Sequence, residues 1–400
     1  MKKRSLLLLF SVVFMDMVGF GFIIPLLPDY IARFNGNPAL VGLLASTYAL
    51  GQFFAAPVVG RLSDKYGRKP LLLISIGGTF ISLLLLGAAW ALPLVFLSRV
   101  LDGLTGGNIT VAQSYIADMT TDEERAKGLG LIGAAFGLGF ILGPLFGGLL
   151  SKFGLPAPAF AAAGVAFLNL LLIGFVLPES LSAEKRAQMA MNPRRKFSLK
   201  LLVEALKKRQ TGSVLHVIMF YSLAFIMFQT MFSVIAKERL GIEADTRGYI
   251  LAYVGVLAAG VQGGLIGVLT KRFSETKLML ASGVLLVIGF TLWAVSHTIP
   301  FLLIALVPLA VGGGVLGVVN RSLLSKSVKP EEIGGALGLS ASLESLNGIV
   351  APALGGLLFS SVGDWAPGAA AALILLWVTL FIWRKIAKPR LFADTLSGSN

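Results

Sequence analysis

The chain has 400 residues, of which 56% are hydrophobic and 14% are charged. A soluble domain cannot bury so large an apolar fraction, so the composition excludes an ordinary globular protein and indicates that lipid is the solvent. The chain has no cysteine, which excludes disulfides and thiolate metal sites. The formal net charge of +14 fits either a nucleic-acid surface or a membrane topology, and the positions of the basic residues decide between them.

Apolar runs long enough to cross a bilayer recur along the whole chain, and they predict an all-α integral membrane protein with 12 transmembrane helices. The first run continues to Leu27 with no small-residue cleavage site, so we interpret it as a span and not as a cleaved signal peptide. In chain order the predicted spans are 5–28, 39–60, 70–90, 93–117, 127–150, 157–177, 213–236, 247–269, 278–296, 299–320, 333–359 and 366–386.

Lysine and arginine alternate between the two sides of these spans. If both termini are inside, 28 of the 34 basic residues fall at the termini or in inner loops, five face outward, and Arg99 lies within a span. This asymmetry follows the positive-inside rule and predicts a multi-pass protein of the cell inner (plasma) membrane with cytoplasmic termini. The basic charge therefore indicates topology and contact with anionic lipid, and no nucleic-acid partner is expected.

One long polar interval, 178–212, separates six predicted spans from six. We predict a six-helix bundle over 1–177, a cytoplasmic linker over 178–212 and a second bundle with a short cytoplasmic tail over 213–400. Within the linker, 197–209 is either an amphipathic surface helix or part of a solvated basic segment. GPLFGGLL at 143–150 and APALGGLL at 351–358 are related copies. Such parallel repeats predict two pseudo-symmetric bundles with a site between them near the midplane.

The stretch GRLSDKYGRKP, 60–70, follows the second predicted span. Its glycines allow a tight turn, Pro70 can start the next helix, and Asp64 can engage cationic neighbours. We interpret it as a charged latch between bundles, with a generic charged turn as the alternative. The candidate gating residues on this side of the membrane are Gly60, Asp64, Gly67, Arg68, Lys69 and Asp118.

The fourth and fifth predicted spans carry two further motifs. In LSRVLDGLTGG, 97–107, Arg99 needs a partner at this depth, and Asp102 lies on the same helical face. The two are candidate proton-coupling residues, or a local structural ion pair. In GLGFILGPLFGG, 137–148, small residues permit close helix packing or sliding. The candidate gating residues here are Gly143, Pro144, Gly147 and Gly148.

Together these motifs resemble those of the major facilitator superfamily, in its 12-helix drug/proton antiporter branch. MDMVGFGFIIPLLP is similar to the first helix of tetracycline-efflux-type transporters. The resemblance covers the whole chain, more densely over 10–150. It implies a role for Arg99 in proton transfer, with Asp102 at a position where the family pattern has Gln or Ser. It also implies that the fifth-helix motif lies at the bundle interface and opposes leak.

Two carboxylates lie midway along predicted spans, and both are candidate proton sites. Asp16 is in the first span and Glu344 in the eleventh. We rank Asp16 first, because the first span of this fold lines the cavity whereas the eleventh lies closer to the flank. Glu344 can instead be a hydrogen-bonded packing residue.

The candidate substrate cavity combines polar and aromatic side chains from the first, fourth and seventh spans. Tetracycline-efflux transporters carry acids in the third and ninth helices, where this chain offers Ser82 and Ser282, which argues against a site for metal-chelated tetracycline. A pocket for a lipophilic compound is expected instead. Its candidate residues are Asp16, Phe20, Gln113, Phe228 and Gln229.

The sequence favours a secondary transporter that exports a small lipophilic compound or drug in exchange for protons. A proton symporter or facilitative uptake carrier is the first alternative, and a non-transporting receptor or scaffold is the second. An enzyme is not expected, since the two histidines form no metal motif and no nucleophile elbow is present. We expect no cofactor and no metal site. The expected partners of the monomeric protein are a small-molecule substrate, protons and the lipid bilayer.

Overall fold

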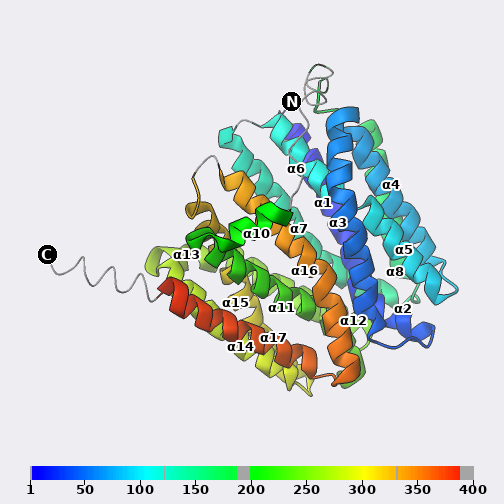
Figure 1. Ribbon diagram of the computed structural model, residues 1–400. Coiled ribbons are helices and arrows are strands. Elements are labelled where there is room, and N and C mark those ends of the chain that lie inside the picture. Colours follow the sequence, from blue (N-terminus) through cyan, green and yellow to red (C-terminus); the bar gives the residue numbers. More distant parts are fainter. Residues whose placement is uncertain are drawn as a thin grey trace. The chain divides into compact units, whose positions relative to one another are not determined.

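The computed structural model describes residues 2–120, 122–182, 184, 186, 199–329 and 332–387. Every regular element in these ranges is helical (Figure 1). Most of the predicted linker between 183 and 198 and the predicted tail from 388 onward lie outside the described residues.

The chain forms two compact units. Unit 1 comprises Met1–Lys196 and Gly241–Gly255, and unit 2 comprises Phe197–Leu240 and Val256–Asn400. The short segment Gly241–Gly255 therefore packs with the first unit although it follows the first helix of the second. The division into domains at 177 and 212 stays a prediction.

In unit 1 the first helix packs between two later ones. The helices are α1 (Lys2–Ile23), α2 (Leu27–Arg33), α3 (Leu40–Tyr66), α4 (Arg68–Gly87), α5 (Leu92–Thr105), α6 (Asn108–Met119), α7 (Asp122–Ser151) and α8 (Ala157–Phe175), with a 3₁₀ turn at Ile24–Leu26. α1 contacts α7 and α8, α4 contacts α8 and α5, and α3 contacts α5. The first part of α12 (Ala244–Gly260) also belongs to this unit.

Unit 2 repeats the same pairing. Its helices are α10 (Leu199–Lys207), α11 (Arg209–Leu240), α13 (Ile266–Arg272), α14 (Glu275–Ala294), α15 (Ile299–Lys326), α16 (Ile333–Ser361) and α17 (Ala366–Ile382); π-helical turns at Val261–Leu265 and Trp383–Ala387 extend α12 into α13 and continue α17. α11 contacts α16 and α17, and α14 contacts α17 and α15. Each pair matches a pair in unit 1 six spans earlier, as the internal repeat predicts.

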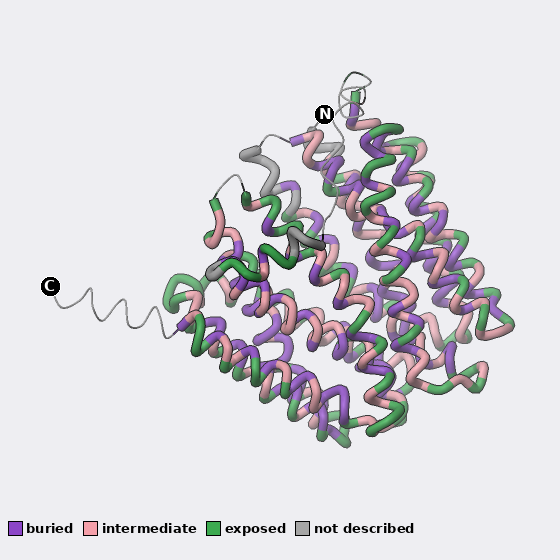
Figure 2. Tube along the Cα trace, viewed as in Figure 1, coloured by how far each residue is buried: buried purple, intermediate pink, exposed green. Residues whose placement is uncertain are grey.

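Burial follows stripes along the helices, with exposed positions on the opposite faces (Figure 2). Large apolar side chains occupy many of these exposed positions, among them Ile74 and Leu373, which are 62% and 66% exposed. In water such a surface would be unfavourable, whereas in a bilayer it is the face that contacts lipid. The two faces of each helix are therefore suited to a membrane-embedded bundle.

Eleven described helices are long and apolar enough to span a bilayer. The fourth predicted span, 93–117, is missing from this set because it is divided into α5 and α6 at Gly106 and Gly107. The loop predicted at 60–70 is also shorter than expected. α3 continues to Tyr66 and α4 begins at Arg68, so Gly67 alone separates the two helices.

An arginine at the end of α11 joins three elements of unit 2. Arg239 donates to the backbone oxygens of Trp293, Ala294 and Ser296 at the end of α14, and its Nε lies 2.6 Å from Asp364 Oδ2. Asp364 lies in the turn between α16 and α17, and the hydrogen bond from Arg239 lowers the pKa of this carboxyl group below its ordinary value. Arg239 thus provides a hydrogen-bond donor for carbonyl groups at the end of α14 and just beyond it.

Candidate functional site

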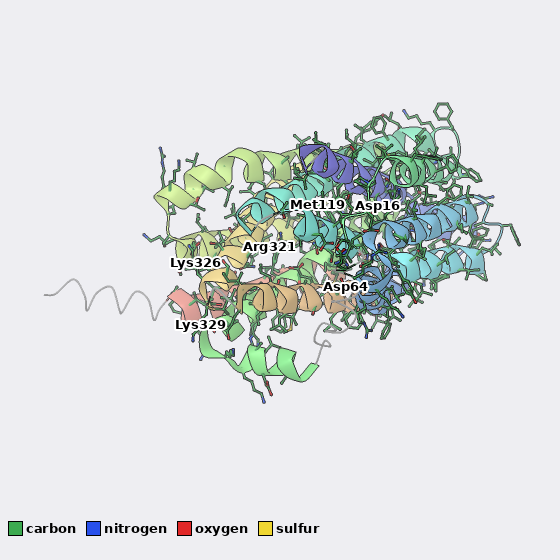
Figure 3. The ribbon with its side chains drawn as sticks, turned by 90° about the horizontal axis from the view of Figure 1, so that it is seen from above. Asp16, Asp64, Met119, Arg321, Lys326 and Lys329 are labelled. Atoms are coloured by element: carbon green, nitrogen blue, oxygen red, sulfur yellow. The ribbon has the colours of Figure 1, made fainter. Side chains whose placement is uncertain are left out.

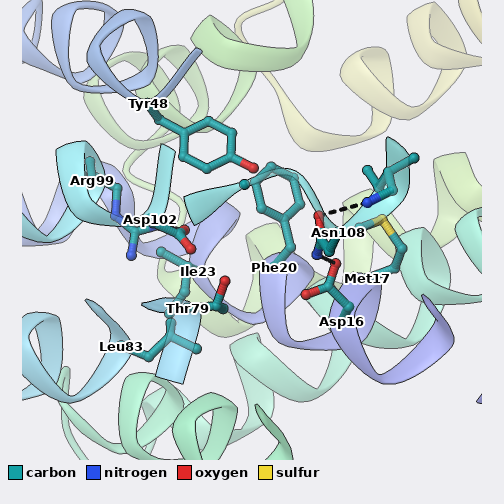
Figure 4. A pocket seen from close by; sticks show the side chains of 12 residues that line it. Asp16, Met17, Phe20, Ile23, Tyr48, Thr79, Leu83, Arg99, Asp102 and Asn108 are labelled. Atoms are coloured by element: carbon teal, nitrogen blue, oxygen red, sulfur yellow. Dashed lines mark hydrogen bonds and ion pairs between the residues drawn. The ribbon is translucent and has the colours of Figure 1, made fainter. Parts of the chain in front are cut away.

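A small polar cavity lies inside unit 1, where α1, α3, α4, α5 and α6 meet (Figure 4). Its volume of about 30 Å³ is enough for one or two water molecules. Four predicted site residues line it, two from α1 and two from α5. The lining residues are Asp16, Met17, Phe20, Ile23, Tyr48, Thr79, Leu83, Arg99, Asp102, Gly106, Asn108 and Ile109.

Asp16 lies midway along α1, half-buried, with its carboxylate at the cavity. Asn108 Nδ2 donates a hydrogen bond to Asp16 Oδ2 at 2.5 Å. Within the part of the chain that the structure describes, no ion pair involves Asp16. The carboxylate is therefore held by a neutral donor beside a space large enough for water.

Arg99 and Asp102 form the ion pair that their helical spacing predicts. Arg99 Nη1 lies 3.1 Å from Asp102 Oδ2, and both side chains are buried. Arg99 Nη2 is also buried and has no hydrogen-bond partner among the described protein groups. Since this nitrogen belongs to a cavity-lining residue, a water molecule in the cavity can accept its hydrogen bond.

An aromatic pair covers the same cavity. The rings of Phe20 and Tyr48 lie 5.8 Å apart, and Gln52 donates to the Tyr48 hydroxyl oxygen at 3.2 Å. Tyr48 approaches α5 closely because Gly103 has no Cβ, and an added Cβ would overlap the Tyr48 backbone oxygen. Sequence reasoning missed Tyr48 and Asn108, which lie on separate helices without a motif of their own.

The other predicted cavity residues lie elsewhere. Gln113 is on an exposed face of α6 and Gln229 on an exposed face of α11. Phe228 is 4% exposed and packs in the interior of unit 2, with its ring 4.9 Å from that of Trp293. The structure therefore packs Phe228 against aromatic side chains of unit 2, and its place in the substrate cavity stays a prediction.

Glu344, the second candidate proton site, lies half-buried on α16 in unit 2. Its cationic neighbour is Arg321 on α15, and the positive charge of Arg321 attracts the Glu344 carboxylate. Arg321 is followed along the chain by Lys326 and Lys329, the basic residues labelled near the end of α15 (Figure 3). Lys326 Nζ contacts Glu275 Oε1 at 2.7 Å.

A buried arginine joins the predicted gating acids at the end of α3. Arg68 Nη1 lies 2.6 Å from Asp64 Oδ1, and Arg68 Nε lies 2.8 Å from Asp118 Oδ2 at the end of α6. Arg68 Nη1 also donates to Ser63 Oγ at 2.7 Å. The Arg68 side chain is 0% exposed. We call Ser63, Asp64, Arg68 and Asp118 the loop cluster, and all four residues belong to unit 1.

Glu179 lies after α8 and binds the backbone beside the loop cluster. No motif in the sequence marks this residue. Its carboxylate accepts the backbone N–H groups of Arg68 and Lys69, at 2.9 and 3.1 Å, so it caps the start of α4. Gly67 has a φ of 108°, and an added Cβ would overlap the Glu179 carboxylate. Glycine is therefore required here both by backbone conformation and by this close approach. Lys69 Nζ donates to Gly174 O at 2.8 Å.

The predicted glycine motif of the fifth span forms the contact between α7 and α1. A Cβ built at Gly143 would lie 2.6 Å from Gly21 Cα and 3.0 Å from the Val18 backbone oxygen. At Gly147 it would overlap the Phe22 backbone. At Gly148 it would lie 2.9 Å from the Asp245 backbone oxygen, and the Pro144 carbonyl faces Gly248 in the same way. At Gly60, from the other motif, an added Cβ would lie 3.4 Å from Thr110 Cγ2.

Replacing Gly143 with alanine is expected to destabilise the protein by about 1–3 kcal/mol, because two helix backbones must move apart to admit the methyl group. Thermal unfolding in detergent micelles measures the effect. Gly137→Ala on the same helix is the matched control, since an added Cβ there meets nothing within 4 Å. The prediction is wrong if the two variants unfold at the same temperature.

A second buried arginine joins the start of α12 to the 3₁₀ turn and α2, which follow α1. Arg247 is 0% exposed, and its guanidinium donates to the backbone oxygens of Pro25 and Ile242 and pairs with Asp29. Nearby, Lys152 Nζ lies 3.2 Å from Asp245 Oδ2, and this hydrogen bond raises the pKa of Lys152. In the sequence, Lys152 and Arg247 stand out only as outward-facing charges.

Comparison with known proteins identifies the family. Residues 9–273 and 257–395 match the model of the Major Facilitator Superfamily, and the two matches together cover nearly the whole chain. The chain belongs to the major facilitator superfamily. It is 32% identical to the tetracycline resistance protein, class C, of Escherichia coli over 385 residues, which are 94% of this chain and 96% of that protein.

Two further relatives agree with the family assignment. Solute carrier family 67 member A1 of Homo sapiens is 35% identical over 369 residues, 89% of this chain and 86% of that protein. The crystal structure of a mutant of the nucleoside transporter NupG superposes with a TM-score of 0.78 at 14% identity, covering 96% of this chain and 100% of that one. The major facilitator fold predicted from the motifs is thereby confirmed. The chain is a multi-pass membrane transporter for a small-molecule substrate, and it is not an enzyme.

Proposed function

We propose that the chain is a proton-coupled exporter of a small lipophilic compound and that it works by alternating access. The observation that carries the proposal is the Asp16 carboxylate, which lies in a membrane span, faces a water-sized cavity and is held by a neutral amide. The similarity of the chain to the tetracycline resistance protein of Escherichia coli supports export as the direction.

In the proposed cycle, Asp16 takes up a proton from the outside and releases it to the cytoplasm while a cytoplasmic substrate enters. Competition between proton and substrate for one state of the protein supplies the coupling. One pH unit across the membrane is worth about 1.4 kcal/mol for each proton, which corresponds to a tenfold substrate gradient. Arg99 and Asp102 line the same cavity, and we assign to their ion pair the role of adjusting to the charge that Asp16 gains and loses.

The loop cluster and the glycine contact of α7 are proposed to control the conformational change. The loop cluster joins the ends of α3, α4 and α6 through two ion pairs to Arg68. Because buried ion pairs have strict geometry, such a cluster has discrete states rather than a continuum of them. Gly143 and Gly147 set the distance at which α7 can slide along α1.

The proposed location is the cell inner (plasma) membrane, with both termini in the cytoplasm. The distribution of basic residues supports this orientation, which places the loop cluster on the cytoplasmic side. The outward-facing side then carries Asp29, Lys152 and Arg247. We propose that the transporter acts as a monomer.

Reconstitution into lipid vesicles with an imposed pH gradient tests the function. A pH-sensitive dye reports the gradient while lipophilic cations, neutral drugs and sugars are added one at a time. We expect a lipophilic compound to dissipate the gradient and to move against the proton. Movement with the proton would instead show a symporter, and substrate binding without any flux would show a receptor or scaffold. Either result contradicts proton-driven export.

A further inference from the structure

Asn108 lies directly after a break in the fourth predicted membrane span. α5 ends at Thr105 and α6 begins at Asn108. The break arises from the local hydrogen bonds. Gly106 N donates to Gly103 O and Gly107 N to Thr105 O, so both amides leave the regular pattern of a helix.

Two contacts stabilise this break, a hydrogen bond from Thr105 and the packing of Gly107 against Val59. Thr105 Oγ1 donates to Leu101 O at 2.9 Å and thus binds a carbonyl group at the end of α5. Gly107 packs against Val59, and an added Cβ would overlap that side chain. The chain can pass α3 at this point only because position 107 is glycine. The first residue after the break, Asn108, is thereby directed into the cavity (Figure 4).

The orientation of the Asn108 amide is determined by two neighbours. Its Oδ1 accepts the backbone N–H of Ile109 at 2.9 Å, so its Nδ2 faces Asp16 Oδ2, 92 residues away in the chain. The amide therefore joins the start of α6 to the middle of α1. An amide N–H stabilises a carboxylate and fixes which of its oxygens faces the cavity.

We propose that Asn108 is a positioning residue for proton coupling, which holds the Asp16 carboxylate at the cavity, and that the break between α5 and α6 places it there. This inference rests on the proposed function, in which Asp16 carries the proton. The other titratable groups around the cavity are Tyr48 on α3 and the Arg99 and Asp102 pair on α5. Asn108 is neutral, and it donates directly to Asp16 Oδ2.

Helix α6 connects the contact between Asp16 and Asn108 with the loop cluster. This helix has 12 residues, with Asn108 at its start and Asp118, the partner of Arg68, in its last turn. A change in the contact between Asp16 and Asn108 acts on one end of a short rigid helix whose other end belongs to the loop cluster. The proton site and the loop cluster are thus joined by a single element of secondary structure.

The test compares Asn108→Leu with the wild type in vesicles that carry a pH gradient. Leucine keeps the branched shape and the number of side-chain heavy atoms, although its methyl groups are bulkier. It removes the hydrogen bond that Asn108 donates to Asp16 and that favours the charged carboxylate. We expect gradient-driven transport to fall about tenfold and its half-maximal pH to move upward by about one unit, the size of one hydrogen bond to a charged group. Substrate exchange without a gradient should continue.

Asn169→Leu is the matched control. Asn169 Nδ2 donates to Val12 O at 2.9 Å, so it also holds α1, one turn before Asp16, but it does not touch the carboxylate. A purely structural role for Asn108 predicts the same result for both variants, namely lower stability with an unchanged pH profile. That result would overturn the proposal, as would a wild-type rate and pH profile for Asn108→Leu.

A swapped pair provides a second measurement. In the double variant Asp16→Asn with Asn108→Asp, the carboxylate returns to the same cavity from α6. We expect it to transport at least about tenfold faster than Asp16→Asn alone. Asp16→Asn also separates the hypothesis that Asp16 carries the proton from the hypothesis that Asn108 positions its carboxylate. If it transports like the wild type, the proposed proton site is wrong; if it is inactive while Asn108→Leu is normal, only the role of Asn108 is wrong.

Discussion

Replacing Asp16 with asparagine is expected to abolish proton-driven transport, to less than about one hundredth of the wild-type rate. Asparagine has nearly the same shape and its side-chain oxygen can still accept the hydrogen bond from Asn108, so the cavity stays packed. It cannot bind and release a proton, however, and the gradient then has no group on which to act. Dye-monitored vesicles with an imposed pH gradient measure the loss.

Substrate exchange at equal pH distinguishes a coupling defect from a folding defect. The Asp16→Asn variant should still exchange labelled substrate across the membrane, because that process needs no net proton movement. Glu238→Gln is the control for a lost carboxylate, since Glu238 is exposed on α11 in unit 2 and does not line the cavity. Undiminished pH-driven export by Asp16→Asn would exclude Asp16 as the proton carrier.

Replacing Arg68 with alanine is expected to destabilise the transporter by about 3–5 kcal/mol, which is a large part of the stability of an ordinary protein. Arg68 is completely buried between two carboxylates, and the Asp64 and Asp118 side chains are only 12% and 9% exposed. Removing the guanidinium takes away the positive charge that both of these buried carboxylates contact. Thermal unfolding of the purified protein in detergent measures the effect.

Two other substitutions show whether the effect depends on the buried ion pairs. Arg68→Lys keeps the charge but cannot bind both carboxylates in the same fork geometry, so we expect an intermediate loss of stability. Arg61→Ala removes an exposed arginine of the same motif, whose Nε donates to Pro57 O, and should change stability by less than about 0.5 kcal/mol. Equal unfolding temperatures for Arg68→Ala and Arg61→Ala would contradict the argument.

Much of the fold could be predicted from the sequence because spans, turns and repeats are local properties. Apolar length predicts a helix wherever it occurs, and spacing of three residues places Arg99 and Asp102 on one helical face. The same reasoning could not find the division between α5 and α6. The span remains apolar through the glycine pair, and the break depends on Thr105 and on contact with Val59 from another helix.

The candidate site shows a similar division between local and distant information. A lone acid in an apolar run marks Asp16 without knowledge of any other helix, since burying a charge is costly wherever the run lies. Its partner could not be inferred, because Asn108 is 92 residues away and nothing in the sequence shows which faces of α1 and α6 meet. Phe228 shows what local information leaves open. An aromatic residue in a span fits a cavity and a core equally well, and only the structure shows that Phe228 is buried.

The sequence by itself therefore determined the membrane class, the helical spans, the repeat and the family, because hydropathy, charge asymmetry and motif spacing are read along one chain. Only the tertiary structure decided which side chains meet. It placed Glu179 at the start of α4, Arg68 between Asp64 and Asp118, and Asn108 against Asp16. These contacts depend on the packing of helices that are distant in the chain, and that packing is set by the combined shape of many side chains.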